Sequence, residues 1–227
     1  GHRRLAIIDL TAAAAQPMVS ADGRFVISFN GEIYNFRELR ETLTAAGSRF
    51  RSDSDTEVIL EACARWGVDG AARKLNGMFA FALWDRRERR LYLARDRLGI
   101  KPLYYRCDAQ SVLFGSELKA LRAFPQWQPE LDRDALAAYM RHGYVPAPRT
   151  IYREVYKLPP GQILTLGAAD RPELHAYWDL REIARQGVAS ARAAERDPQA
   201  AVAELEQLLR DADDKPRARF EARTAPR

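Results

Sequence analysis

The chain has 227 residues, of which 47% are hydrophobic and 30% are charged, a composition typical of a globular protein that can bury its own core. Its net charge is +5, but acids and bases alternate and only residues 215–227 form a basic run, so the charge lacks the motif or aromatic context of a nucleic-acid-binding face. No apolar run approaches the roughly 20 residues of a membrane span, and no signal peptide is expected, so neither nucleic acid nor membrane is an expected partner.

The first predicted elements are two strands and a helix. Leu5–Leu10 and Phe25–Phe29 are short apolar runs, which predict buried strands. Asn35 is expected to cap a helix that carries apolar residues at helical spacing and ends at Gly47.

A capping box predicts the second helix. Ser54–Glu57 reads Ser-Asp-Thr-Glu, in which the glutamate is expected to bind the backbone N–H of the serine. The helix should end at Gly67. Cys63 falls on its apolar face and Cys107 ends a later strand, so both are expected to be buried. Cysteines without metal-ligand spacing predict neither a disulfide framework nor a metal site, and they fit a reducing cytoplasm.

Four strand-like runs follow, separated by turn-forming residues: Met78–Trp84, Leu91–Arg95, Leu103–Arg106 and Val112–Phe114. Short turns between consecutive strands predict antiparallel pairing. The charged residues 85–90 indicate an exposed hairpin turn. Arg95 and Asp96 are expected to form a structural pair.

The rest of the chain predicts further helices and then changes in composition. Helices are expected from Ser116-Glu117 to Leu121 and from Asp132 or Asp134 to Met140, with a strand at Gln162–Leu166. The change predicts a domain over residues 1–178, a linker over 179–200, a separate helix over 201–212 and a disordered or frame-shifted tail over 213–227. Strands interspersed with helices, without strict alternation, indicate an α+β protein.

Seven segments, in order and spacing, resemble the class II glutamine amidotransferases of the asparagine synthetase group. They are Gly1–Leu10, Gln16-Pro17-Met18, Phe29–Asn35, Ser54–Leu60, Gly77–Asp85, Arg95–Tyr105 and Phe114–Leu121. The resemblance covers residues 1 to about 178. It implies an Ntn-hydrolase-like αββα sandwich, two antiparallel sheets between helical layers, that releases ammonia from L-glutamine.

The resemblance implies an oxyanion hole at Asn30 and Gly31. In the group, the matching Asn side chain and Gly backbone N–H stabilise the tetrahedral oxyanion of amide hydrolysis. A glycine suits this place because the backbone can approach the substrate closely. The alternative is a plain turn, since Asn-Gly is a strong hairpin signal.

The resemblance also implies three charged ligands for glutamine. Arg4, with Arg3 as the weaker candidate, matches the arginine that binds the α-carboxylate, because a guanidinium can bind both oxygens. Glu32 and Asp55 match the carboxylates that bind the α-ammonium group. For Asp55 the alternative is a helix-terminal role, because an acid is stabilising in the first turn of a helix.

The group has parts that these 227 residues are expected to lack. Its nucleophile is an N-terminal cysteine upstream of the matched region, and neither Cys63 nor Cys107 is expected to replace it. Its first strand would precede Gly1. Residues 201–212 resemble the first helix of its synthetase domain, whose Gly-rich pyrophosphate loop does not follow here. We therefore expect no glutamine hydrolysis by this fragment, and marginal stability because a sheet edge is exposed.

Other functions remain open. In the asparagine synthetase group the missing domain uses ATP and Mg²⁺ to amidate aspartate, and the parent enzyme often forms a homodimer. A ligase with another acceptor, a non-catalytic glutamine-binding module and a structural domain without a ligand are the alternatives. No cofactor is expected in the chain itself, and His2, His142 and His175 are expected to be structural.

Overall fold

The computed structural model describes residues 2, 9, 11–108, 110–167, 171–193 and 197–224. The chain forms two compact units, residues 1–178 and residues 179–227. Each unit is described by itself.

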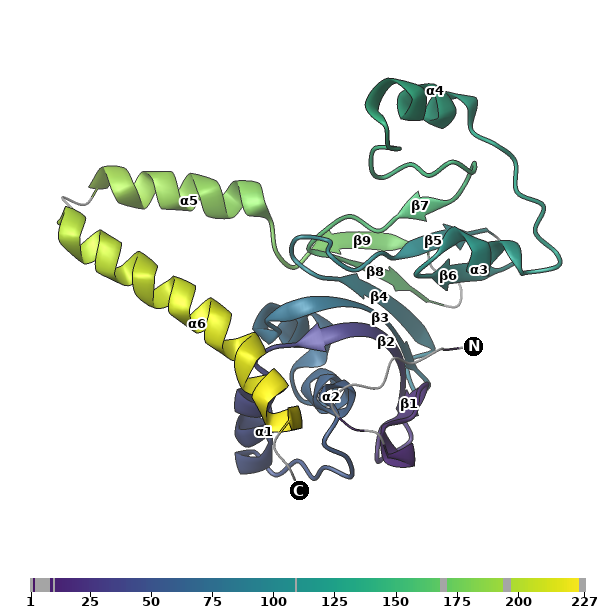
Figure 1. Cartoon of the computed structure of the whole chain (residues 1–227). Coiled ribbons are helices and arrows are strands. Elements are labelled where there is room, and N and C mark those ends of the chain that lie inside the picture. The colour runs from purple at the N-terminus through teal and green to yellow at the C-terminus, as the bar shows by residue number, and fades with distance from the viewer. Residues whose placement is uncertain are drawn as a thin grey trace. The chain divides into compact units, whose positions relative to one another are not determined.

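The first unit contains two antiparallel sheets (Figure 1). The six-stranded sheet has the order β1-β2-β3-β4-β8-β9 and the three-stranded sheet the order β6-β5-β7. The strands of the larger sheet are β1 (Met18–Val19), β2 (Phe25–Ile33), β3 (Gly77–Asp85), β4 (Arg90–Arg95), β8 (Gln162–Leu166) and β9 (Glu173–Ala176). Those of the smaller sheet are β5 (Tyr104–Cys107), β6 (Val112–Gly115) and β7 (Tyr156–Lys157). Antiparallel pairing is therefore confirmed, although the third and fourth predicted runs belong to the second sheet.

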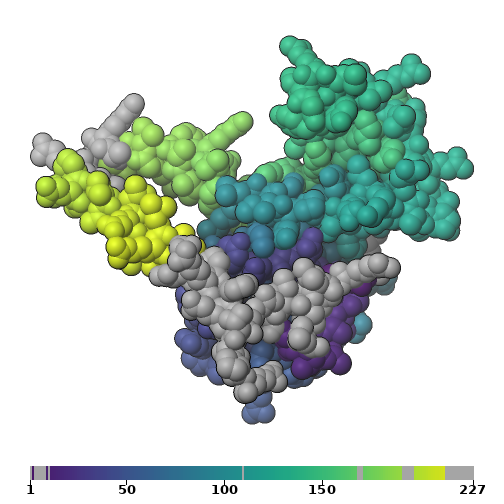
Figure 2. All heavy atoms as spheres, in the orientation of Figure 1, coloured from purple at the N-terminus to yellow at the C-terminus, as the bar shows by residue number. Residues whose placement is uncertain are grey.

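Four α-helices and a short 3-10 turn complete the described part of this unit. They are the turn Ala12–Ala14 and the helices α1 (Phe36–Ala45), α2 (Asp55–Lys74), α3 (Leu118–Arg122) and α4 (Arg133–His142). Helix α4 stands out from the body of this unit in the space-filling view (Figure 2), and Met140 on it is 77% exposed.

The layers follow from three clusters of buried side chains. Phe25, Ile27 and Phe29 of β2 pack with Leu43 of α1 and Ile59 of α2 in the largest cluster, so the two helices cover one face of the larger sheet. On its other face, alanines and leucines of β3, β4 and β8 meet Tyr105 and Cys107 of the smaller sheet. A third cluster around Leu121 of α3 covers the far side of the smaller sheet. The predicted αββα sandwich is confirmed.

The helix ends differ in detail from the prediction. The side chain of Asn35 does not cap α1: its Nδ2 donates to the carbonyl of Lys74 and its Oδ1 accepts from the N–H of Asn76. These bonds tie the start of α1 to the end of α2. Gly67 interrupts α2 with φ 71° and ψ 168°, a conformation that favours glycine, so the predicted stop is a break between two helical segments.

The capping box is only half formed. Ser54 Oγ accepts from the N–H of Thr56 at 3.2 Å, as an N-cap should. The Glu57 carboxylate accepts instead from the N–H groups of Arg51 and Ser52, at 2.9 and 2.7 Å. Glu57 is 3% exposed, so it stabilises the loop before the helix and not the N–H of Ser54.

The second unit consists of two helices in its described residues. They are α5 (Leu180–Ala193) and α6 (Pro198–Thr224). The stretch predicted as a linker is thus largely helical, and the stretch predicted as a tail is helical as far as residue 224. Alanine, arginine and glutamate, which dominate this sequence, have high helix propensity. No helix among the described residues is both long and apolar enough to cross a membrane.

Candidate functional site

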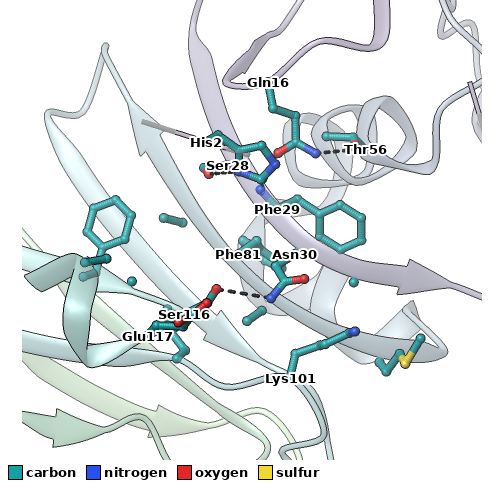
Figure 3. A pocket seen from close by; sticks show the side chains of 18 of the residues that line it. His2, Gln16, Ser28, Phe29, Asn30, Thr56, Phe81, Lys101, Ser116 and Glu117 are labelled. Atoms are coloured by element: carbon teal, nitrogen blue, oxygen red, sulfur yellow. Dashed lines mark hydrogen bonds between the residues drawn. The ribbon is translucent and has the colours of Figure 1, made fainter. Parts of the chain in front are cut away.

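A cavity of about 470 Å³ opens between the two sheets beside β2. Its walls come from β2, from β3, from the start of α2 and from the turn between β6 and α3, with Lys101 and Leu103 before β5 (Figure 3). Among the described residues, Asn30, Gly31, Glu32 and Asp55 all line this one cavity. The structure thus brings together four of the five residues proposed from the sequence. Arg4, the fifth, and its neighbour Arg3 lie outside the described residues.

Strand β2 sends its side chains alternately to the two faces of the sheet. Phe25, Ile27 and Phe29 face the helices and are buried in the main core. Successive residues of a strand point to opposite faces, so Ser28, Asn30 and Glu32 face the other sheet. The alternation explains how one strand supplies both core and cavity.

The backbone N–H groups of β2 alternate in the same way between its two edges. The N–H of Phe29 donates to Gln16 Oε1 at 2.6 Å and that of Ile33 to Asp55 Oδ2 at 3.1 Å, both on the side away from β3. Because these directions alternate along an antiparallel strand, the N–H of Gly31 lies on this same edge, between the two. It is a backbone donor at the cavity.

Gly31 is required by the close approach of β2 and β3. A Cβ on Gly31 would lie 2.2 Å from the carbonyl oxygen of Met78 and 2.7 Å from Cα of Phe79. A Cβ on Gly77, across the same strand pair, would lie 2.2 Å from the carbonyl oxygen of Glu32. The hairpin-turn alternative for Asn30-Gly31 is therefore wrong, since both residues lie inside β2 and pair with Ala80 and Phe79.

Asp55 is the first residue of α2 and is only 5% exposed. Its Oδ2 accepts from the N–H of Ile33, so the carboxylate is held against the end of β2. A carboxylate at a helix N-terminus is stabilised by the helix dipole. The helix-terminal role and a place on the cavity wall therefore coincide in one residue.

Asn30 extends from the larger sheet to the smaller one. Its Nδ2 donates to Ser116 Oγ at 3.2 Å, and the two residues are 86 positions apart. Figure 3 shows the Asn30 amide directed at Ser116 across the cavity, with Lys101, His2 and Gln16 also on its walls.

Several lining residues were not predicted from the sequence. Gln16 bonds to the edge of β2 and its Nε2 lies 3.4 Å from Thr56 Oγ1. His2 Nδ1 lies 3.1 Å from Ser28 Oγ, although His2 was expected to be structural. Ser116 and Glu117 were interpreted only as the start of a helix. The motif Gln16-Pro17-Met18 was a sequence signal for Gln16. The bond between Gln16 and the edge of β2 could not be predicted from that motif, because it depends on the fold.

Lys101 is held on the cavity wall by its own loop. Asp96 Oδ2 accepts from its N–H at 2.9 Å, and Arg95 Nε donates to its carbonyl at 2.7 Å. The guanidinium of Arg95 also donates to the carbonyls of Leu158 and Gly99. Arg95 and Asp96 thus act together as structural residues beside the cavity, and they do so by binding backbone groups of the same loop.

The two cysteines are poor nucleophiles. Cys63 is 2% exposed in the core under α2, and burial raises the pKa of its thiol to about 12. Burial also raises the pKa of the half-buried Cys107, to about 11. Because the thiolate is the reactive form, neither side chain offers one near neutral pH, and neither lines the cavity. The burial predicted for Cys63 is confirmed.

Comparison with known proteins decides the family. A model of the glutamine amidotransferase domain matches residues 1–178. The chain belongs to this family. Asparagine synthetase [glutamine-hydrolyzing] 1 of Bacillus subtilis (strain 168) is 48% identical over 166 residues, which are 73% of the chain and 26% of that protein. The resemblance seen in the sequence is therefore confirmed for the amidotransferase domain.

Other relatives of the amidotransferase domain carry different names. The amidase chry2 of Gibberella zeae is 35% identical over 183 residues, which are 79% of the chain and 26% of that protein. The chain thus spans about a quarter of the length of both curated relatives. The solved glutamine phosphoribosylpyrophosphate amidotransferase of B. subtilis, in complex with ADP and GMP, is 21% identical with a TM-score of 0.54, covering 78% of this chain and 34% of that one. This last likeness shows that the fold is shared.

Proposed function

We propose that the cavity binds L-glutamine and that this amidotransferase domain serves the ammonia-releasing step of an asparagine-forming ligase. The arrangement along β2 carries the proposal. Within four residues, this strand presents the Asn30 amide, the Gly31 N–H and the Ile33 N–H that binds Asp55. Two donors and a buried carboxylate thus stand at fixed separations on one cavity wall.

The donors suit the chemistry of amide hydrolysis. Attack on the side-chain carboxamide of glutamine produces a tetrahedral oxyanion, and preorganised N–H groups stabilise the charge as it develops. In the proposal, the Asn30 side chain and the Gly31 backbone are those two donors. Loss of one such donor typically costs about 10²–10³ in rate.

The charged residues suit the amino-acid end of glutamine. The carboxylates of Asp55 and Glu32 line the same cavity, and the proposal assigns them to the α-ammonium group, since ion-assisted hydrogen bonds are the stronger ones. Arg4 is proposed for the α-carboxylate because a guanidinium binds two oxygens at once.

Binding of glutamine and its hydrolysis require different groups of the protein. Neither Cys63 nor Cys107 is placed or ionised for attack, and the resembled group uses an N-terminal cysteine. We therefore propose that the 227-residue chain binds glutamine without hydrolysing it. For the parent protein we propose aspartate as acceptor, ATP and Mg²⁺ as cofactors of a further domain, a homodimeric state and a reducing cytoplasm, which suits two free thiols.

The names of the relatives support this acceptor and also the main alternative. The asparagine synthetase of B. subtilis supports aspartate. The amidase chry2, similar over most of the same residues, is not named as an asparagine synthetase, so a ligase with another acceptor on the same glutamine domain is the main alternative. The acceptor is distinguished by assaying the full-length protein with aspartate, ATP and Mg²⁺.

Titration calorimetry of the chain with L-glutamine and D-glutamine tests the binding proposal. We expect saturable binding of the L isomer and none of the D isomer, because the charged groups fix the α-carbon. In parallel, glutamate release is measured over a blank. Well-folded protein without L-glutamine binding contradicts the proposed function and favours a structural domain. If the chain releases glutamate and Asn30→Ala does not, only the proposal that the chain binds glutamine without hydrolysing it is contradicted.

A further inference from the structure

A carboxamide stabilises an oxyanion only if its donor end faces the charge. The Asn side chain carries an acceptor oxygen at one end and an NH₂ group with two donors at the other. A half-turn of the amide would present the oxygen to the reacting centre and repel the developing charge. The orientation of Asn30 therefore matters as much as its presence.

In the structure, the NH₂ end of this carboxamide is the end bonded to Ser116. Asn30 Nδ2 donates one hydrogen to Ser116 Oγ at 3.2 Å (Figure 3). The amide group is planar and its two N–H bonds diverge by about 120°, so the second N–H points away from Ser116. The bond with Ser116 thus uses one donor and leaves the other for a ligand in the cavity that both residues line.

The position of Ser116 is itself well defined. Ser116 follows Gly115, the last residue of β6, which pairs with Tyr104 of β5. A Cβ on Gly115 would lie only 3.1 Å from Leu121 Cδ1, so the turn packs closely on α3. Asn30 is held by its backbone pairing with Ala80 in β3. The hydrogen bond thus joins β2 of the larger sheet to the turn that follows β6 of the smaller one.

We propose that Ser116 is a positioning residue, whose hydroxyl holds the Asn30 carboxamide with its NH₂ group toward the substrate. This inference rests on the proposed function, because it concerns the same donor.

The test combines a spectroscopic readout with glutamine binding. In the ¹⁵N-labelled chain, the side-chain NH₂ signals of Asn30 are assigned by their loss in Asn30→Ala. We expect hydrogen exchange at this NH₂ group to be slowed in the unmodified chain and about 3- to 10-fold faster in Ser116→Ala. L-glutamine affinity, measured on the same samples, should fall by a similar factor.

Three further variants make the role of the hydroxyl testable. Ser116→Thr retains the hydroxyl and should keep exchange and affinity within about twofold. Ser116→Cys retains the size but has a weak acceptor, so it should behave like Ser116→Ala even if the alanine variant folds poorly. Ser111→Ala is the matched control, since Ser111 Oγ contacts Asp108 at the β5–β6 turn, away from the cavity.

The outcomes separate this inference from the proposed function. Unchanged Asn30 signals in Ser116→Ala and Ser116→Cys overturn it, and so does a threonine variant that behaves like alanine. If the unmodified chain does not bind L-glutamine, the proposed function fails, while the exchange of the Asn30 NH₂ group still decides whether Ser116 orients it.

Discussion

The backbone N–H of Ile33 donates to Oδ2 of Asp55 across 3.1 Å, although 22 residues separate them in the chain. This bond joins the last residue of β2 to the first residue of α2. The same strand carries Gly31 two positions earlier. A negative charge and the candidate oxyanion donors are therefore fixed relative to one another by a single strand and one helix start.

Removing the charge of Asp55 should abolish tight glutamine binding while leaving the fold intact. In Asp55→Asn the amide oxygen can still accept from the Ile33 N–H, but the ion-assisted bond to an α-ammonium group is lost. We expect L-glutamine affinity to fall at least about 10-fold, in line with the roughly 1.5–3 kcal/mol of a charged hydrogen bond.

Asp53→Asn is the control for this measurement by calorimetry. Asp53 lies two residues away, and its side chain is 89% exposed in an ion pair with Arg40. The Asp53→Asn variant should bind L-glutamine with the same affinity as the unmodified chain. Equal affinities for the two variants would refute the assignment of Asp55 to the ammonium group.

Gly31→Ala should destabilise the domain more than a glycine substitution at an open site. The new Cβ would lie 2.2 Å from the Met78 carbonyl oxygen, so β2 and β3 must separate locally. Gly23→Ala is the comparison, since Gly23 has φ +74° but nothing within 4 Å of a Cβ and should lose only the roughly 1–2 kcal/mol of a left-handed backbone. Urea denaturation of both variants gives the difference, and equal midpoints would contradict the close approach.

Acidification should weaken the contact between Arg24 and Asp85. Burial alone would raise the pKa of the Asp85 carboxyl. Hydrogen bonds from Arg24 and from the turn N–H groups nevertheless hold this pKa below its usual value. A carboxyl whose folded pKa is depressed contributes stability above its unfolded pKa of about 3.9 and loses it as the pH falls through the folded value. We therefore expect the contact between Arg24 and Asp85 to stabilise the fold at neutral pH and to lose this effect below about pH 4.

Asp85→Asn tests this pH dependence. Asp85 is 2% exposed and accepts from Arg24 Nη2 at 2.6 Å, so the variant should lose about 1–3 kcal/mol at pH 7 and approach the unmodified chain at pH 3. The control is Asp69→Asn, because the exposed contacts of Asp69 with Arg73 and His175 should contribute at most about 0.5 kcal/mol each. Parallel unfolding curves of Asp85→Asn and the unmodified chain across this range would disprove the linkage.

The cysteines should resist thiol reagents in the folded state. Burial raises the pKa of Cys63 to about 12 and that of Cys107 to about 11, so little thiolate exists at pH 8. We expect Ellman's reagent to label Cys107 slowly and Cys63 more slowly still, with rapid labelling of both in urea. The single variants Cys63→Ala and Cys107→Ser assign the two phases. Fast labelling of Cys63 in native buffer would show that its burial is wrong.

Elements with a strong local pattern could be predicted from the sequence. The apolar run at β3 predicted a strand, and Asp132 and Asp134 were the two candidates for the start of α4. Asp132 is the N-cap, and its side chain accepts from the N–H groups of Asp134 and Ala135. Short strands such as β1 and β7 carry too few residues to show a period. They form because neighbouring strands offer an edge for backbone pairing. The presence of such an edge depends on the fold and not on the local sequence.

The candidate site was predictable only where a motif marks it. Asn30, Gly31, Glu32 and Asp55 come from two short motifs, and the fold places all four at one cavity. Ser116 contacts Asn30 from the turn after β6 of the other sheet, and no local pattern encodes contacts of this range. Glu57 shows the converse: its spacing from Ser54 fits a capping box, but N–H groups of the preceding loop compete for the same carboxylate.

Within the described residues, two side chains occupy backbone N–H groups of β2 on the side away from β3. Gln16 occupies the N–H of Phe29 and Asp55 that of Ile33, two of the positions at which a foreign strand would pair with this edge. Such a strand would have to break both bonds and bury the carboxylate of Asp55 against its own backbone. The polar groups that shape the cavity thereby also make these two N–H groups unavailable to a strand of another copy.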